Sequence, residues 1–129
     1  MVLTKDLEKL KTRTIVGLIE FVTCYSKSKR KHEEVKARID TGATKSSIDI
    51  ELAKKLNLGP VIGNKTIKNA HGSVKRDLIE VEIKIAGKLL REKFTLADRS
   101  NLKYPLLIGR NILQHDFLID PKKRLVRKD

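Results

Sequence analysis

Residues 35–43 constrain the fold of this chain more than any other stretch. Apolar and polar side chains alternate from Val35 to Ile39, the period-two pattern of a strand with one buried face. The strand then runs into Asp-Thr-Gly at positions 40–42, residue types that favour turns over strands. A carboxylate is therefore carried from a packed strand onto a tight loop, whose backbone N–H groups can hold it ionised. A plain turn at the end of a strand would use the same residues, so this stretch alone leaves both interpretations open.

A second constraint comes late in the chain, at residues 106–113. An apolar run ends at Gly109 and passes into a short helical pattern that begins with Arg110. Together with the Asp-Thr-Gly loop, this order of motifs resembles the retropepsin-like aspartic proteases. Their pattern is an apolar strand, Asp-Thr-Gly-Ala, a hairpin flap, and then two apolar residues followed by Gly, Arg and Asn or Asp.

Within that clan the chain is most similar to a small prokaryotic family of retropepsin-like aspartic endopeptidases whose members carry the label ATP-dependent zinc protease. The resemblance runs from about residue 14 to about residue 125 in motif order. Its matching stretches are residues 15–20, 37–43, 72–76, 98–99, 107–110 and 117–121. It implies a mostly β, closed barrel of the acid protease fold with two or three short helices, functional as a homodimer. We expect residues 1–13 to be an N-terminal extension with helical periodicity and residues 14–129 to be a single retropepsin-like domain.

Composition sets the broad class of the protein. At 129 residues the chain can bury the core of one domain, and its single cysteine allows no internal disulfide. No apolar run is long enough for a membrane span, and the N-terminus lacks the apolar region of a signal peptide. We therefore expect a cytoplasmic protein with no membrane partner. The net charge of +13, from 29 basic and 16 acidic residues, predicts attraction to polyanions such as acidic polypeptides or nucleic acid.

Four further segments can be placed from their patterns. Residues 15–22 are almost continuously apolar and predict a strand buried on both faces. Residues 66–76 contain turn residues between two polar arms, which predicts a hairpin; by resemblance this is the flap over the substrate. Alternation from Ile79 to Ile85 predicts a strand with one buried face. The basic loop at residues 26–32 is either a site for an anionic partner or simply solvated, and we favour the second interpretation.

The chemistry of an aspartic protease needs two carboxylates that share one proton. This chain has one Asp-Thr-Gly, and the Gly109 stretch, where a second copy would fall in a two-lobed enzyme, has no aspartate. The second carboxylate must therefore come from another copy of Asp40, as in a two-fold dimer that places both loops on its axis. The fold prediction thus carries a homodimer with it.

The resemblance assigns a role to each residue of these motifs. It predicts that Asp40 is catalytic within its loop, that substrate contacts come from the loop, the flap and the second apolar stretch, and that the Gly-Arg pair supports the loop. The catalytic set is Asp40, Thr41 and Gly42; the substrate-binding set is Ala43, Thr44, Asn69, Ala70, His71, Gly72 and Ile108; the supporting set is Gly109 and Arg110.

One position departs from the viral pattern. Viral retropepsins have Asp after Asp-Thr-Gly-Ala, and that Asp partners the Arg of the Gly-Arg pair, whereas this chain has Thr44 there. The prokaryotic family that the chain resembles has the same kind of replacement. We therefore expect Arg110 to find a different anionic partner.

The zinc and ATP in the family label find no support in the residues. His32, His71, His115 and Cys24 are scattered without the spacing of a metal site, and no GxxxxGK[ST] loop is present. We expect no metal and no cofactor.

Three functions remain open. The first is a homodimeric aspartic peptidase acting on polypeptides, including acidic or glutamate-rich ones, since relatives of the family are linked to ligases that add glutamates to proteins. The second is a retropepsin-fold binding module with little turnover. The third is a basic nucleic-acid-binding or ribosome-associated protein, although no aromatic residues interleave with the lysines to stack on bases.

Overall fold

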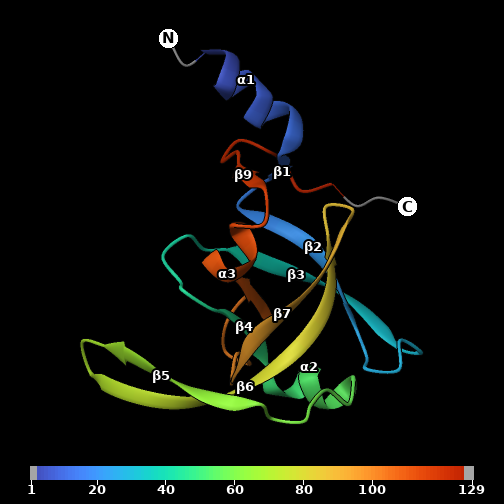
Figure 1. Ribbon diagram of the computed structural model, residues 1–129. Coiled ribbons are helices and arrows are strands. Elements are labelled where there is room, and N and C mark those ends of the chain that lie inside the picture. Colours follow the sequence, from blue (N-terminus) through green and yellow to red (C-terminus); the bar gives the residue numbers. More distant parts are fainter. Residues whose placement is uncertain (1–2, 127–129) are drawn as a thin grey trace.

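The structure is a computed structural model and describes residues 3–126 (Figure 1). Met1 and Val2 of the predicted extension and residues 127–129 of the predicted domain lie outside the described residues. The helices are α1 (Leu3–Thr12), α2 (Ile50–Lys55) and α3 (Arg110–Leu113). The strands are β1 (Thr14–Val16), β2 (Ile19–Tyr25), β3 (His32–Ile39), β4 (Ser46–Asp49), β5 (Gly63–Asn69), β6 (Gly72–Ile85), β7 (Lys88–Ala97), β8 (Leu106–Ile108) and β9 (Phe117–Ile119).

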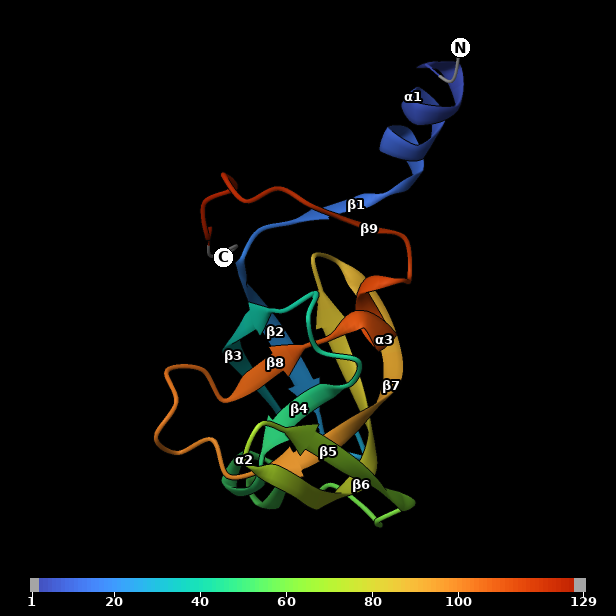
Figure 2. The same ribbon diagram turned by 90° about the vertical axis from the view of Figure 1, so that its left-hand side faces the viewer.

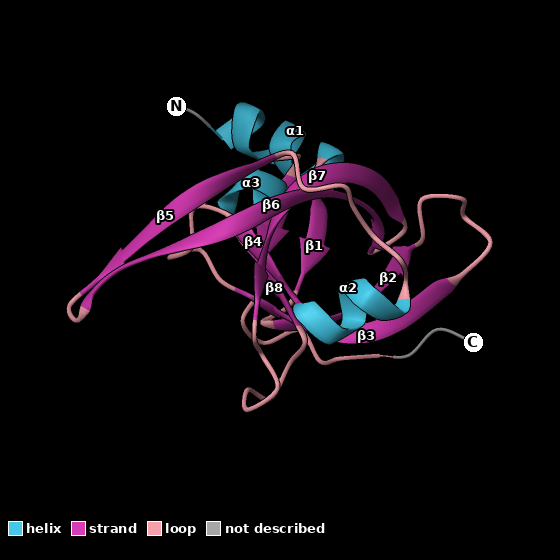
Figure 3. Cartoon of the chain, turned by 90° about the horizontal axis from the view of Figure 1, so that it is seen from below, coloured by secondary structure: helices cyan, strands magenta, loops and turns pink. Residues whose placement is uncertain are grey.

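Six strands close into a barrel within the described part of the chain. The order is β2-β3-β8-β4-β7-β6, and β6 pairs again with β2 to complete the ring. Strand β5 extends the sheet beyond β6, so that the β5–β6 arm reaches out from the barrel (Figure 3). This confirms the predicted mostly β, closed-barrel fold with three short helices.

The barrel interior is formed by the apolar half of each alternating strand. In β6, Ile79, Val81, Ile83 and Ile85 are at most 1% exposed, while the acidic and basic residues between them face outward. Val22, Ile48, Phe94 and Ile108 fill the same interior with no exposed surface. The alternation predicted for residues 79–85 is thus confirmed, and it determines which face of β6 enters the core.

The strand predicted over residues 15–22 is wrong in one respect. The chain breaks after Val16 into β1 and β2, and the strand that follows buries only one face. Leu18, at the break, is 50% exposed. A tertiary contact lies at this break, because a Cβ on Gly17 would be 2.9 Å from the backbone oxygen of Lys123.

The two ends of the described chain meet outside the barrel. β1 pairs in parallel with β9, while α1 stands away from the barrel (Figure 1). Glu20, only 6% exposed, accepts hydrogen bonds from the backbone N–H of Gly17 and from Lys123 Nζ, each at 2.6 Å. The C-terminal segment is thus fastened to the start of β2. A helix with the length and apolar character needed to cross a membrane is not found between residues 3 and 126.

Candidate active site

Asp40 follows the last residue of β3 directly. Its backbone N–H donates to the carbonyl oxygen of Ile108 at 2.9 Å, continuing the parallel pairing of β3 with β8. Parallel pairing places the ends of both strands at one edge of the sheet, so the Asp40 loop and the Gly109 stretch meet there. The two motifs that sequence analysis singled out are therefore neighbours in space, as Figure 2 shows for β3 and β8.

The loop holds the Asp40 carboxylate by its own backbone. Asp40 Oδ1 accepts a hydrogen bond from the N–H of Gly42 at 2.9 Å, and the Asp40 carbonyl accepts one from Ala43 at 3.3 Å. A Cβ at position 42 would lie 3.1 Å from Oδ1, which favours glycine there. Asp40 Oδ2 has no hydrogen-bond partner among residues 3–126. One oxygen is thus fixed and the other is available to a ligand.

Gly109 permits the closest backbone approach in this region. A Cβ on Gly109 would lie 2.6 Å from the Lys45 carbonyl oxygen and 2.9 Å from that of Ala43. Beyond it, the first N–H groups of α3 donate to the loop: Arg110 to Ala43 at 2.8 Å and Asn111 to Thr44 at 3.2 Å. The start of the helix therefore caps the carbonyls of the Asp40 loop, and a side chain at 109 would push the two segments apart.

The Arg110 side chain braces the same loop without an anion. Its Nη1 donates to the Thr41 carbonyl at 3.2 Å and its Nη2 donates to Thr44 Oγ1 at 3.1 Å. No ion pair in the described chain includes Arg110, so its partners there are neutral, and a different anionic partner stays a prediction. The Thr44 hydroxyl can accept this hydrogen bond without needing a charge.

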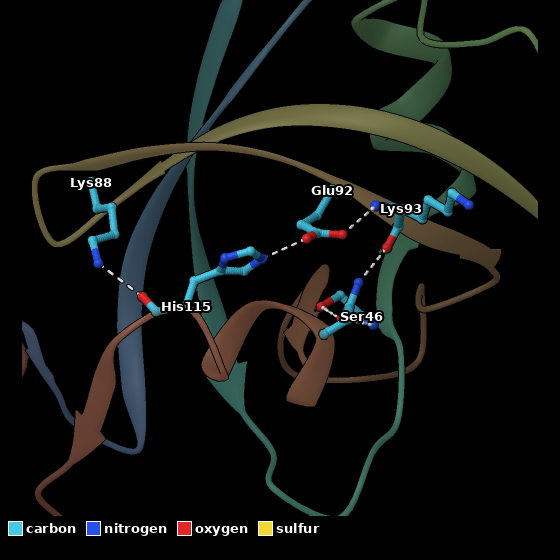
Figure 4. Close-up of polar contacts among 6 residues, drawn as sticks. Ser46, Lys88, Glu92, Lys93 and His115 are labelled. Atoms are coloured by element: carbon cyan, nitrogen blue, oxygen red, sulfur yellow. Dashed lines mark hydrogen bonds and ion pairs between the residues drawn. The ribbon is translucent and has the colours of Figure 1, made fainter. Parts of the chain in front are cut away.

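A buried polar network that sequence analysis missed lies behind the loop. Asn111, 7% exposed, accepts from the Ser46 backbone N–H at 3.0 Å and from Ser46 Oγ at 2.8 Å, and it donates to the Lys93 carbonyl at 2.8 Å. Gly109 N–H donates to Ser46 Oγ at 2.9 Å. These bonds join α3, β4 and β7 around the loop (Figure 4). The signal in the sequence was the Asn after Gly-Arg, but its partners are far away in the chain.

His115 takes part in a structural contact beside this network. Its Nε2 lies 2.6 Å from Glu92 Oε2, and its carbonyl accepts a hydrogen bond from Lys88 Nζ at 2.8 Å (Figure 4). His32 and His71 are exposed and Cys24 is buried. In the part of the chain that the structure describes, no three His, Cys, Asp or Glu side chains gather as a metal site would require.

The predicted flap is a hairpin formed by β5 and β6. Asn69 pairs with Gly72, which leaves Ala70 and His71 as the two turn residues. Asn69 Oδ1 accepts from the His71 backbone N–H at 2.8 Å, and Gly72 has a φ of +124°, a conformation that favours glycine. The hairpin tip and the loop between β3 and β4 lie on the same side of the barrel (left in Figure 1). No hydrogen bond within residues 3–126 joins the turn to Asp40.

Ile108 is not placed to meet a ligand. It has no exposed surface and belongs to the barrel core, so the substrate contact expected of its side chain is not available in this conformation. Leu107 is partly exposed on the opposite face of β8. The period of two explains the difference, because a shift of one residue along a strand reverses the face.

Comparison with known proteins identifies the family. The sequence model of the RimB-like family, described as retropepsin-like aspartic endopeptidase RimB, matches residues 51–129, more than half of the chain. The chain belongs to the RimB-like family. The matched region includes the Gly109 stretch and the hairpin but begins after the Asp40 loop.

Solved structures share the fold of this RimB-like chain. The Legionella pneumophila protein Lpg0085, of unknown function, has a TM-score of 0.60 and 20% identity, and the match covers 87% of this chain and 96% of that one. EIAV protease, solved with an inhibitor, has a TM-score of 0.53 and 26% identity, covering 63% of this chain and 75% of that one. A retropepsin-like aspartic protease from Rickettsia conorii has a TM-score of 0.51 and 21% identity, covering 74% and 77%.

Curated relatives have a different name. Two proteins named probable alpha-L-glutamate ligase, from Shewanella halifaxensis and Shewanella pealeana, are each 28% identical over 114 residues. Each match covers 69% of this chain, but only 25% of the relative. The chain therefore spans about a quarter of the length of these relatives.

Proposed function

We propose that the protein is an aspartic peptidase whose active site forms when two copies of the chain bring their Asp40 carboxylates together. The observation that carries this proposal is the state of Asp40, with Oδ1 fixed by Gly42 N–H and Oδ2 available. Membership of a retropepsin-like aspartic endopeptidase family supports the reaction class. Gly42 holds the carboxylate, and Gly109 and Arg110 hold the loop that contains Thr41.

The proposed chemistry divides two roles between the paired carboxylates. Two like charges at short range cannot both ionise, so the pair holds one proton. The ionised carboxylate accepts a proton from the attacking water, while the protonated one donates a hydrogen bond to the carbonyl of the scissile peptide bond.

Asp40→Asn tests the reaction, because Asn keeps the size of the side chain but cannot share a proton. We expect peptide hydrolysis to fall at least about a hundredfold, in line with loss of a general acid–base group. Asp116→Asn is the matched control, since Asp116 is an exposed aspartate whose φ of +65° asparagine also adopts. Full activity in Asp40→Asn would exclude the aspartic mechanism.

The homodimer is tested independently by sedimentation. Analytical ultracentrifugation should give twice the mass of the 14.7 kDa chain at the concentrations where peptide is cleaved. A monomer that cleaves peptide would contradict the proposed arrangement. We also expect hydrolysis to survive EDTA; loss with EDTA and recovery with zinc would show that the chemistry depends on a metal.

The proposed substrate is an acidic polypeptide segment, bound by the loop, the hairpin turn and neighbouring surface. The net charge of +13 supports this choice, because a cationic surface attracts acidic chains. The similarity to proteins named glutamate ligases points to the same chemistry, since products of such enzymes carry added glutamate. A cytoplasmic location fits a chain whose one cysteine is a buried thiol.

A second candidate is a binding module that holds acidic segments without cleaving them. The match of this chain to about a quarter of proteins named as ligases favours it, because a domain attached to another enzyme can serve to bind its substrate. The two candidates differ at Asp40. A binding module would keep its affinity and its cellular role in Asp40→Asn, whereas a peptidase would lose the role with the activity.

A further inference from the structure

The basic loop between β2 and β3 is held in an ordered turn by its own backbone. The N–H of Ser26 donates to the Lys31 carbonyl at 2.9 Å, and the Ser26 carbonyl accepts from the Lys29 N–H at 2.9 Å. Ser26 is only 6% exposed, and its hydroxyl accepts from the Lys31 N–H at 3.1 Å. The loop that the sequence suggested is simply solvated is therefore a defined turn.

An ion pair fastens this turn to the outer face of β6. Lys29 Nζ lies 3.3 Å from Glu82 Oε2, and the Glu82 side chain is only 14% exposed. Lys29 also has a φ of +63°, a conformation typical of tight turns. Lys29 is thus engaged within the protein, whereas the next two residues, Arg30 and Lys31, are exposed.

A surface hollow lies between the end of this turn and the end of α2. Its volume is about 410 Å³, and its lining residues are Arg30, Lys31, His32, Glu33, Lys55 and Leu56. Figure 3 shows α2 beside β3, and an ion pair of 2.9 Å between Lys55 and Glu33 joins the two elements. Leu56 is 2% exposed and belongs to the core, so the other five residues give the hollow its polar surface.

Two cations of the hollow are unpaired. Glu33 is the one carboxylate among the six lining residues, and both of its oxygens lie 2.9 Å from Lys55 Nζ. The side chains of Arg30 and Lys31 have no hydrogen bond or ion pair within residues 3–126. Charges of one sign in a concave surface attract counter-ions strongly, because the protein walls focus their field. The hollow therefore has the electrostatics of an anion site.

The unpaired donors suit carboxylates. The guanidinium of Arg30 presents a planar fork that matches two carboxylate oxygens, and the ammonium of Lys31 has three donors. Sites for single-stranded nucleic acid combine cations with aromatic rings on which the bases stack. No Phe, Tyr or Trp is among the six lining residues of the hollow. Its chemistry thus favours an acidic side chain over a nucleotide.

The hollow and Asp40 lie at opposite ends of β3. The strand begins at His32, which lines the hollow, and Asp40 follows its last residue. The turn before β3 and the loop after it accordingly lie on opposite sides of the barrel (right and left in Figure 1). The eight residues of β3 span about 26 Å at about 3.3 Å per residue. An extended polypeptide needs at least about eight residues to reach from one to the other.

We infer that this hollow is a docking site for a glutamate-rich segment of a polypeptide, held by Arg30 and Lys31. One glutamate carboxylate accepts hydrogen bonds from the Arg30 fork, and a neighbouring one pairs with Lys31. The inference goes beyond the proposed peptidase, because binding in the hollow does not depend on Asp40. In a peptidase the hollow holds the acidic part of a substrate while a segment farther along the same polypeptide reaches Asp40.

The position of the site is tested by NMR in the Asp40→Asn protein, which keeps the probe from being cleaved. Acetylated, amidated hexaglutamate is titrated into nitrogen-15-labelled protein, with hexaglutamine as the uncharged control. We expect hexaglutamate to shift the amides of residues 30–33 and 54–56 most, and hexaglutamine to leave them in place. Shifts confined to the Asp40 loop and the β5–β6 hairpin, or no shifts, would overturn the docking site.

Charge removal in the hollow is compared with equal charge removal elsewhere. Arg30→Gln combined with Lys31→Gln should fold normally, because both residues hold the turn through their backbones alone. Lys5→Gln combined with Lys9→Gln is the matched control on α1, where both lysines are exposed and away from the barrel (Figure 1). By calorimetry at fixed low salt, the affinity for hexaglutamate should fall at least about fivefold in the first variant, the effect of two exposed charge contacts, and less than about twofold in the second.

The outcomes separate this inference from the proposed function. An equal loss of affinity in the two double variants would reduce the effect to net charge and overturn the docking site. Tighter binding of hexauridylate than of hexaglutamate at residues 30–33 would assign the hollow to nucleic acid and overturn the polypeptide. A loss only in the Arg30 and Lys31 variant, in a protein that cleaves no peptide, would support the docking site and overturn only the peptidase.

Discussion

Two single residues, Gly109 and Cys24, lie in surroundings so crowded or so dry that they limit the behaviour of the protein. Gly109 is the point where the carbonyls of the Asp40 loop come closest to another segment, so it has no room for a side chain. Cys24 is a thiol with no exposed surface, inside the barrel. The first residue limits the geometry of the candidate site, and the second limits the pH range over which the barrel is stable.

Gly109→Ala should destabilise the protein and weaken any activity at Asp40. The added methyl group would lie 2.6 Å from the Lys45 carbonyl oxygen, so backbone must move. We expect the free energy of unfolding to fall by about 1–3 kcal/mol, measured by urea denaturation. Gly63→Ala is the control, because its Cβ would lie 4.0 Å from Leu78 Cδ1, and it should change stability by no more than about 0.5 kcal/mol. Equal effects of the two changes would contradict the assigned role of Gly109.

Cys24 should make the protein less stable at alkaline pH. Burial, with a smaller contribution from Glu33, raises the pKa of the Cys24 thiol from 9.0 to about 12. The unfolded chain loses this proton near pH 9.0, while the folded chain keeps it, so the stabilisation is complete below pH 9.0 and is lost as pH rises towards 12.

The measurement compares urea denaturation of wild type and Cys24→Ala from pH 8 to pH 10.5. Above pH 9.0 the free energy of unfolding of wild type should fall relative to the variant, by at most about 1.4 kcal/mol per pH unit. Lysines titrate in both proteins, so their effect cancels in the difference. If the free energy of unfolding changes with pH in the same way in both proteins, burial does not keep the Cys24 thiol protonated.

Among the secondary-structure elements, α3 is held firmly by the rest of the structure, whereas the β5–β6 hairpin is held loosely. α3 is one short turn, yet its backbone N–H groups, Arg110 and the buried Asn111 bind it to the Asp40 loop and to β4 and β7. The hairpin is much longer, but β5 pairs with β6 alone at the edge of the sheet. The rigid side of the candidate site is therefore the helix side, and the hairpin is the side able to move.

Hydrogen exchange should detect this difference along β6 itself. Residues 72–75 are exposed, whereas Ile79, Ile83 and Ile85 in the same strand are buried. Opening the hairpin exposes little apolar surface, so we expect the amides of residues 66–69 and 72–75 to exchange faster than those of residues 79–85. Exchange followed by mass spectrometry at neutral pH provides the comparison. Equal protection in the two halves of β6 would remove the moving flap from the proposed site.

Across the whole molecule, the net charge of +13 acts over longer distances than any one contact. The basic loop between β2 and β3 is exposed, as are Lys54 and Lys55 of α2. Attraction between exposed charges is screened over about 10 Å at 0.1 M salt. The general charge should therefore guide acidic chains to the protein.

Association rates should show this guidance. In stopped-flow experiments a glutamate-rich peptide should associate faster than an uncharged peptide of equal length. This difference in association rate should shrink as salt rises from 0.05 to 0.5 M, because the screening length then falls from about 14 to about 4 Å. The dissociation rate should change less, since steering acts on encounter. The uncharged peptide is the control and should be insensitive to salt. If the association rate of the acidic peptide is also insensitive to salt, the net charge contributes only to solubility.

The sequence by itself determined the local elements and the family. The alternation up to Ile39, the turn residues at 40–42, and the Ala70–His71 turn are set by side-chain period and turn chemistry, which act between near neighbours. The strand, the hairpin and the short helix after Gly109 were therefore predictable. The resemblance supplied their order, which led to the closed barrel.

Only the tertiary structure decided which residues meet across the barrel. The parallel pairing of β3 with β8 placed Gly109 against the Asp40 loop and turned Ile108 into the core. The same packing gave Arg110 its neutral partners and buried Arg99 against Asp49 and the Tyr104 carbonyl. The close approach of Lys123 to Gly17, at the break between β1 and β2, likewise joins residues more than a hundred positions apart in the chain. These outcomes depend on strand register and on contacts between distant segments, and both are set by the packing of the whole core, which local pattern does not encode.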